Sequence, residues 1–285
     1  MTVLEVLKLA TDHFQRHGSD SARLDAEVLL AHTLGLRRLD LYLKFDRPLS
    51  EAELSKYRSL TAKRAKGEPV AYLVGHKEFM GLDFVVTPAV LVPNPDTEVL
   101  VQRAVEIARE AVRPLRVADV GTGSGCIAIA IAHDALNAEV VASDVSQEAL
   151  EVAAQNVAAY GLGERVKLIC GDLMAPFTGS FDIVCANLPY VASGSHLAPE
   201  VVAQPAGALY ADERGSALIT RLLDEAPARL NAGGHVLAEL DPSITSSVVD
   251  AAKQFAGHRI HRDLAGHERV LEAWSSIPTN SEPSA

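Results

Sequence analysis

The sequence predicts an α/β protein with a doubly wound parallel sheet that follows a small helical domain. After about residue 96, short and almost wholly apolar segments alternate with helical ones, as in a sheet covered on both faces. Before residue 72, apolar residues recur at helical spacing and no alternating strand pattern interrupts them. We therefore expect a helical domain over 1–71, a β-hairpin linker over 72–95, a sheet domain over 96–276 and a flexible tail over 277–285.

The helical domain is expected to hold three helices. Ser50 and Glu53 form a capping box that opens the third helix, and Gly67 and Pro69 end it. The apolar residues with helical spacing are Leu4, Leu7 and Phe14 in the first helix and Leu24, Val28 and Leu34 in the second. In the linker, apolar residues around Gly81 predict the hairpin.

The sheet domain begins with a helix from about Thr97 that stops before Pro114. Its expected strands are 116–120, 139–143, 166–170, 181–186, 235–240, 259–263 and 270–274. One further helix is expected to begin near residue 124, and three others are expected to cover 146–160, 216–230 and 243–255.

Composition limits the possible functions. Of the 285 residues, 48% are hydrophobic and 22% charged, which suits a globular protein with a sizeable core. A net charge of −11 disfavours a nucleic-acid backbone as the main partner. No apolar run reaches the roughly 20 residues of a membrane helix, and no signal-peptide pattern opens the chain. The three cysteines lack metal-ligand spacing. We therefore expect a cytoplasmic monomer with no metal, membrane or direct nucleic-acid partner.

A glycine-rich turn follows the first expected strand of the sheet domain. The turn consists of Gly121, Thr122, Gly123, Ser124 and Gly125, and a helix starts at once behind it. Glycines let the backbone turn sharply and let a ligand approach the main chain. The free N–H groups at the helix start favour a carboxylate or another anion. We expect all five residues to bind a nucleotide-like cofactor.

Two acidic residues follow the next two strands. Asp144 ends the second strand and can accept hydrogen bonds from both hydroxyls of a ribose. Asp172 follows the third strand and is placed to reach an adenine amine, with Leu173 against the ring. With the glycine turn, these acids resemble the S-adenosylmethionine site of class I methyltransferases more than a dinucleotide site. Asp119 either touches the methionine amine or only shapes the turn.

The sequence Asn187-Leu188-Pro189-Tyr190 directly follows the fourth strand. Ligands of open parallel sheets bind beyond the carboxyl ends of the strands, so Asn187 is expected to face the same crevice, next to the cofactor. Its side-chain oxygen and the Leu188 carbonyl can accept the two N–H bonds of a planar –NH₂ group and aim the nitrogen at a methyl carbon. Pro189 keeps Leu188 extended, and Tyr190 can stack on the flat acceptor.

Four longer motifs carry a family resemblance over nearly the whole chain. They are residues 21–30 (SARLDAEVLL), 72–82 (YLVGHKEFMGL), 90–98 (VLVPNPDTE) and 266–270 (GHERV). With them, the chain resembles the HemK/PrmC family of glutamine methyltransferases, which modify peptide-chain release factors. The resemblance implies S-adenosyl-L-methionine as cofactor, S-adenosyl-L-homocysteine as product, and methylation of the glutamine in a Gly-Gly-Gln loop. Asn187, Leu188, Pro189 and Tyr190 would bind that glutamine, and the helical domain would help to dock the release factor.

The sequence departs from the family pattern at four places. Leu188 stands where proline is usual, and Asn94 stands where arginine is usual. Gln204-Pro205 replaces a common glutamate–proline pair, and Glu239-Leu240-Asp241 lacks the usual glycine after the glutamate. None of these changes removes a proposed catalytic group. Together, the four departures leave room for an altered substrate preference.

Three other functions are compatible with parts of the sequence. An adenine methyltransferase acting on RNA or DNA also needs a site for a flat –NH₂ group, and Asn-Leu-Pro-Tyr also occurs in rRNA adenine dimethyltransferases. A non-enzymatic binding module could retain the fold, and a nicotinamide oxidoreductase could use the glycine turn. The acidic charge and the N-terminal motifs argue against the first alternative, and the complete set of site residues argues against the second.

Overall fold

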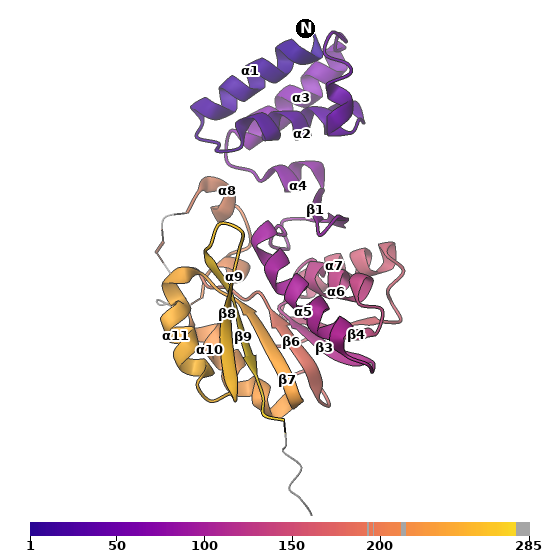
Figure 1. Cartoon of the computed structure of the whole chain (residues 1–285). Helices are drawn as coiled ribbons and strands as arrows, with labels where there is room; N and C mark the ends of the chain where they lie inside the picture. The colour runs from indigo at the N-terminus through magenta and orange to yellow at the C-terminus, as the bar shows by residue number, and fades with distance from the viewer. Residues whose placement is uncertain (193, 196, 212–214, 278–285) are drawn as a thin grey trace, which may run out of the picture. The chain divides into compact units, whose positions relative to one another are not determined.

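The computed structural model describes residues 1–192, 194–195, 197–211 and 215–277, which fall into two compact units (Figure 1). Unit 1 comprises residues 1–76 and the described part of 196–204, and unit 2 comprises the described residues of 77–195 and of 205–285. Of the expected tail, only Ile277 lies within the described residues. Among them, no helix is long and apolar enough to cross a membrane.

Unit 1 is helical, and its core lies between the first three α-helices. Its elements are α1 (Val3–Arg16), α2 (Ala22–Leu34), the short 3₁₀ helix η1 (Arg38–Leu41), α3 (Glu51–Arg64), α4 (Val70–Val74) and α8 (Pro199–Val202). The expected capping box is confirmed, because Ser50 Oγ accepts the N–H of Glu53 while the carboxylate of Glu53 accepts the N–H of Ser50. Phe14, Leu29 and Leu30 are fully enclosed in the core. The three expected helices are therefore present.

A buried ion pair joins two of these helices. Arg64 Nε of α3 donates to Asp25 Oδ2 of α2 at 2.8 Å, and the two side chains are only 7% and 8% exposed. Arg64 also pairs with Glu200 of α8. Removing one partner leaves a buried charge without compensation, which costs several kcal/mol.

We expect Arg64→Ala to lower the free energy of unfolding by about 3 kcal/mol, because Asp25 would keep only the hydroxyl bonds from Ser19 and Ser21. Urea unfolding of the full chain checks this value. Arg58→Ala, at an exposed position of the same helix, is the control and should change stability by less than about 0.5 kcal/mol. Equal midpoints for the two variants would contradict a structural role for the pair.

The expected hairpin is present, with strands β1 (His76–Phe79) and β2 (Leu82–Val85), and all of it but His76 belongs to unit 2. Met80 and Gly81 form the turn with positive φ angles of 52° and 73°. After the hairpin, the chain runs without regular structure to the 3₁₀ helix η2 (Pro95–Thr97), which leads into α5 (Glu98–Glu110).

A seven-stranded sheet follows, with strand order β5-β4-β3-β6-β7-β9-β8. Its strands are β3 (Leu115–Val120), β4 (Ala138–Asp144), β5 (Val166–Cys170), β6 (Phe181–Ala186), β7 (Leu230–Glu239), β8 (Gly257–Arg262) and β9 (Glu268–Trp274). The neighbours β5, β4, β3, β6 and β7 pair in parallel, but β9 runs antiparallel to both β7 and β8. The five central strands are therefore parallel, as expected, and the antiparallel β9 makes the sheet mixed at this edge. The short turn between β8 and β9 makes them a hairpin, and a hairpin is antiparallel by necessity.

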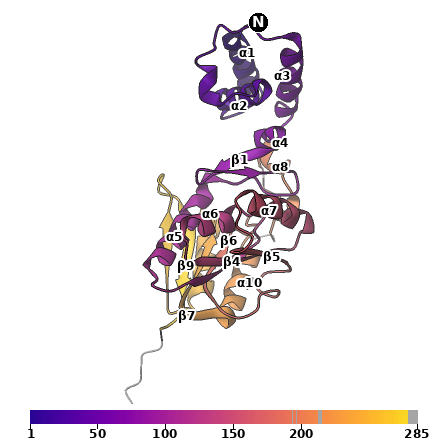
Figure 2. The same cartoon turned by 90° about the vertical axis from the view of Figure 1, so that its right-hand side faces the viewer.

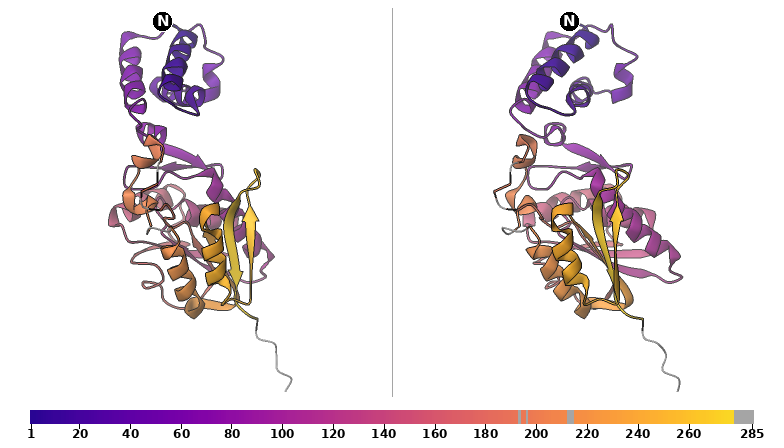
Figure 3. Two further views of the ribbon diagram at one scale, coloured as in Figure 1. Left: turned by 90° about the vertical axis from the view of Figure 1, so that its left-hand side faces the viewer. Right: turned by 60° about the vertical axis from the view of Figure 1, so that its left-hand side comes forward.

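Helices cover both faces of the sheet (Figures 1, 2 and 3). The helices of this unit are α5, α6 (Cys126–Asp134), α7 (Gln147–Ala159), α9 (Ala206–Leu209), α10 (Ala217–Glu225) and α11 (Thr245–Ala252). One apolar core joins α5, α6 and α7 to one face, and a second joins α10 and α11 to the other. Successive strand residues alternate between these cores: Val117 belongs to the first and Ala118 to the second. The doubly wound fold class is thus confirmed.

Two predicted boundaries differ from the structure by five residues each, the start of β7 and the end of α10. β7 starts five residues before the expected His235, because Leu230 pairs with Phe181 ahead of an irregularity in the β6–β7 ladder. The α-helix α10 ends at Glu225, and residues 226–229 continue as a 3₁₀ helix. Pro227 lies there and lacks the N–H that an α-helix needs.

Candidate active site

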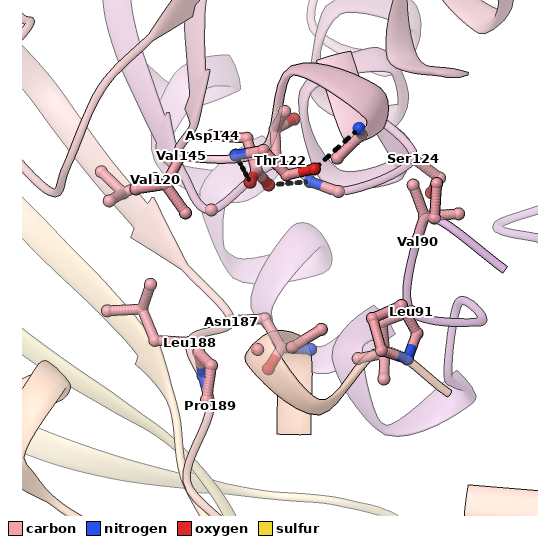
Figure 4. A pocket seen from close by; sticks show the side chains of 18 of the residues that line it. Val90, Leu91, Val120, Thr122, Ser124, Asp144, Val145, Asn187, Leu188 and Pro189 are labelled. Carbon is pink, nitrogen blue, oxygen red and sulfur yellow. Dashed lines mark hydrogen bonds between the residues drawn. The ribbon is translucent and has the colours of Figure 1, made fainter. Parts of the chain in front are cut away.

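A cavity of about 420 Å³ lies at the carboxyl ends of the central strands (Figure 4). Residues that end or follow four neighbouring parallel strands line it: Gly121 after β3, Asp144 at the end of β4, Gly171 after β5 and Asn187 after β6. Its volume is in the range of small-molecule sites. Of the residues predicted for the site, all line this cavity except Gly125 and Tyr190.

The glycine turn is held tightly against β4. The N–H groups of Gly121 and Thr122 both donate to the carbonyl of Ser143, at 2.9 and 2.8 Å. Gly121 has a φ of 75°, and a Cβ there would lie 3.0 Å from Cδ2 of Leu188. A side chain would therefore be strained and would press against the acceptor motif. Gly125 also has a positive φ, and a Cβ would meet Ala153 at 3.3 Å, so this glycine serves the packing of α6 on α7.

Asp119 shapes the turn from beneath. Its Oδ2 accepts the hydroxyl of Thr122 at 2.6 Å and the N–H of Ala128 at 3.2 Å, and the side chain is fully buried. Burial raises the pKa of Asp119 to about 7, and the nearby Asp144 adds to the rise. Asp119 is not among the residues that line the cavity. The structure therefore favours a role in shaping the turn over contact with the methionine amine. Its Oδ1 is buried and has no hydrogen-bond partner among the described residues.

Asp144 lines the cavity with its carboxylate already oriented (Figure 4). Its Oδ2 accepts the N–H of Gly123 and its Oδ1 accepts the N–H of Ser146, each at 2.9 Å. A carboxylate has about four lone-pair directions, so these two bonds fix the group and leave acceptor capacity for ligand hydroxyls.

Asp172 and Leu173 form the wall beyond β5. Asp172 is more exposed than Asp144, and its carboxylate pairs with Arg221 of α10, a partner that the sequence pattern did not reveal. Leu173 is buried and has a φ of 42°, in the left-handed region that branched residues rarely adopt. Such strain is common at ligand sites, where the surrounding structure imposes it.

Asn187, Leu188 and Pro189 of the Asn187–Tyr190 motif form the opposite wall. Asn187 Nδ2 donates to Thr97 Oγ1 at 3.0 Å, which fixes the amide plane and leaves its carbonyl oxygen as an acceptor. Leu188 is buried and Pro189 lines the cavity. Tyr190 instead directs its hydroxyl to Glu239 Oε1, 3.3 Å away. Burial raises the pKa of Tyr190 well above its ordinary value, and the charge of Glu239 contributes to this rise. Stacking of Tyr190 on the acceptor stays a prediction.

Several wall residues come from segments that sequence reasoning had not assigned to the site. Residues 88–94 after the hairpin line the cavity, and so do Pro205, Gly207, Ala208 and Leu218. Thr97 also lines it and is 2% exposed. The sequence pattern assigns Thr97 only to the start of a helix. Its place in the 90–98 motif is the sequence feature that could have indicated a role in the site.

Comparison with known proteins agrees with this geometry. Residues 5–75 match the PrmC N-terminal domain, and residues 95–216 match the methyltransferase small domain. The chain is 42% identical to a release factor glutamine methyltransferase of Rhodopirellula baltica over 95% of both chains. It is 41% identical to one of Geobacter sulfurreducens over 84% of both. A methyltransferase structure from Pyrococcus furiosus, 19% identical, shares the fold with a TM-score of 0.52 over 77% of this chain and 99% of that one. The chain therefore belongs to the release factor glutamine methyltransferase family.

Proposed function

We propose that this chain methylates the side-chain amide nitrogen of the glutamine in the Gly-Gly-Gln motif of peptide-chain release factors. The methyl donor is S-adenosylmethionine, and the products are the N-methylated amide and S-adenosylhomocysteine. One observation carries the proposal: the glycine turn, Asp144 and the Asn187 motif line a single cavity. We further propose that the protein acts as a cytoplasmic monomer, with residues 1–71 helping to dock the release factor.

The residues on the β3–β5 side of the cavity suit the cofactor. Gly123 has open space where a side chain would project, so a ligand could approach its backbone. Asp144 would accept the ribose hydroxyls, Asp172 would receive the adenine amine, and Leu173 would lie against the ring. When bound, S-adenosylmethionine supplies an electrophilic methyl carbon on a positively charged sulfur. The acidic side chains around the cavity favour that charge.

The residues on the β6 side suit a planar amide. An amide nitrogen is a weak nucleophile because its lone pair is delocalised, so the enzyme must hold it in line with the methyl–sulfur bond. The Asn187 side-chain oxygen and the Leu188 carbonyl would accept the two N–H bonds of the acceptor and support the positive charge that grows on nitrogen. The new bond joins nitrogen to the methyl carbon as the carbon–sulfur bond breaks, and the nitrogen then releases a proton to solvent.

A transfer assay with three classes of acceptor tests this proposal against its nearest rival. Labelled S-adenosylmethionine is incubated with the protein and a release factor, bulk RNA or duplex DNA at several salt concentrations. We expect label on the release factor alone, with little dependence on salt. Label on nucleic acid, with an affinity that falls steeply as salt rises, would instead identify an adenine methyltransferase.

A further inference from the structure

We propose that Asn156 is a positioning residue for the cofactor, because one side chain holds both the glycine turn and the strand that leads into the cavity wall 88–94. Asn156 lies on α7 and does not line the cavity, so it would act through the backbone that it holds. The inference rests on the proposed placement of S-adenosylmethionine in this cavity. It does not depend on which acceptor receives the methyl group.

The Asn156 side chain makes three hydrogen bonds to backbone atoms of the described residues. Its Oδ1 accepts the N–H of Val85 at 2.8 Å, and its Nδ2 donates to the carbonyl of Val85 at 3.0 Å. The second hydrogen of Nδ2 is donated to the carbonyl of Ser124 at 2.8 Å. Asn156 is 1% exposed, so these bonds are shielded from water.

The three bonds permit one orientation of the Asn156 amide. Turned by 180°, the amide would place Oδ1 against two carbonyl oxygens and its –NH₂ group against the N–H of Val85. Mismatched polar groups at this depth are costly. Leucine and aspartate have a similar shape, but leucine makes none of these bonds and aspartate lacks both donors. The position therefore requires an asparagine amide.

The bond to Ser124 acts on the glycine turn. Ser124 is the fourth residue of the turn 121–125 and lines the cavity (Figure 4). The next residue, Gly125, lies against the same helix, because a Cβ there would meet Ala153, three residues before Asn156 on α7. One face of α7 therefore supports the turn at two successive residues, through packing at Gly125 and through a hydrogen bond at Ser124.

The two bonds to Val85 act on the strand β2. Val85 is the last residue of this strand, and the Asn156 amide pairs with its N–H and C=O as a residue of a neighbouring strand would. Pro88 follows three residues later and is the first residue of the cavity wall 88–94. Val86 and Val90 are each 1% exposed, so packing also holds the chain that continues from Val85 into this wall.

A cofactor in this cavity would meet two walls that Asn156 holds in advance. Binding then spends little free energy on ordering the turn and the segment 88–94, and preorganisation of this kind raises affinity. The described hydrogen bonds of Asn156 do not reach the acceptor motif 187–190. Loss of the Asn156 amide should therefore change the cofactor Kd and leave the transfer step at saturating cofactor nearly intact.

Tyr160 provides a matched control, because it holds the same strand without a described bond to the glycine turn. Its hydroxyl accepts the N–H of Asp83 at 2.6 Å and donates to the carbonyl of Asp83 at 2.8 Å. Tyr160 does not line the cavity. Tyr160→Phe therefore loosens β2 two residues before Val85 and keeps the bond from Asn156 to Ser124.

The first test is the S-adenosylmethionine Kd of Asn156→Ala, measured by calorimetric titration. We expect this Kd to rise roughly tenfold, a factor of the order that one buried hydrogen-bonding group supplies. At saturating cofactor, kcat with the release factor should change less than about twofold. Tyr160→Phe should also unfold at a lower temperature but keep its Kd within about twofold. An unchanged Kd in Asn156→Ala, or an equal rise in Tyr160→Phe, would overturn the inference.

Hydrogen exchange in the absence of cofactor tests the arrangement itself, and a second variant is available if Asn156→Ala fails to fold. Asn156→Asp keeps the shape and the acceptor for Val85 but sets a carboxylate against the carbonyls of Val85 and Ser124. In either Asn156 variant, peptides covering 86–95 and 119–128 should exchange faster than in the unmodified protein. In Tyr160→Phe, the peptide covering 119–128 should be unaffected. Unchanged exchange of that peptide in the Asn156 variants would contradict the arrangement.

The cofactor Kd of Asp144→Asn separates failure of this inference from failure of the proposed function. If Asp144→Asn weakens binding and Asn156→Ala does not, the inference alone is wrong. If neither substitution changes the Kd, the placement of the cofactor and the inference are both wrong. If both weaken binding and the unmodified protein does not methylate the release factor, the proposed acceptor is wrong and the role of Asn156 is supported.

Discussion

Replacing Asn187 with alanine is expected to lower kcat about a hundredfold or more while leaving the fold and cofactor affinity nearly intact. The side-chain oxygen would be one of the two acceptors that hold the substrate nitrogen, and losing one preorganised polar contact of this kind typically costs a factor of 10²–10³. The side chain is partly exposed in the cavity wall and makes one described side-chain bond, to Thr97, so its removal disturbs little packing.

Single-turnover methyl transfer, together with calorimetric titration of S-adenosylmethionine, checks this prediction. The control is Asn231→Ala. Asn231 lies near the start of β7, at the end of the sheet away from the cavity, and its side chain donates to Asp182 at 2.6 Å. That variant should lose stability and keep its turnover once folded. Full activity of Asn187→Ala would show that the proposed acceptor mechanism is wrong.

Replacing Asp144 with asparagine is expected to weaken S-adenosylmethionine binding roughly tenfold to a hundredfold. Hydrogen bonds to a charged group contribute about 1.5–3 kcal/mol each, and the substitution removes the charge and one acceptor oxygen that also holds the N–H of Gly123 or Ser146. The loss should appear in the cofactor Kd and only weakly in kcat at saturating cofactor.

Equilibrium titration over a range of cofactor concentrations gives this Kd. Asp250→Asn is a suitable control, because Asp250 is exposed and its described side-chain contact is an ion pair with Lys253. An unchanged Kd in Asp144→Asn would remove this residue from the cofactor site and leave the glycine turn as the main evidence for it.

The sequence predicts the central part of the fold well because its signals there are local. Strands β5 and β6 begin and end at the expected residues, since each is a short apolar run between turn residues. The direction of β9 was not predictable from apolarity, because a strand pairs in parallel or antiparallel according to the connection before it. The early start of β7 depends on pairing with Phe181, a contact made by a distant segment.

The residues of the candidate site also fall into those that local sequence signals predict and those that depend on tertiary packing. The sequence predicts that Gly121, Asp144 and Asn187 lie together because each ends or directly follows its strand, and the carboxyl ends of parallel strands meet at one edge. Thr97 lies 90 residues from its partner Asn187, and Glu239 lies 49 residues from Tyr190. Neither carries a spacing signal. Only tertiary packing brings these two side chains behind the acceptor motif.

The most direct test of the central claim is to locate the methyl group. The purified protein is incubated with labelled S-adenosylmethionine and a release factor, and with a matched factor whose Gly-Gly-Gln glutamine is replaced. Peptide mass spectrometry then maps the added mass. We predict one methyl group on that glutamine and none on the matched factor. A methyl group on another residue, or equal transfer to both factors, would contradict the proposed function.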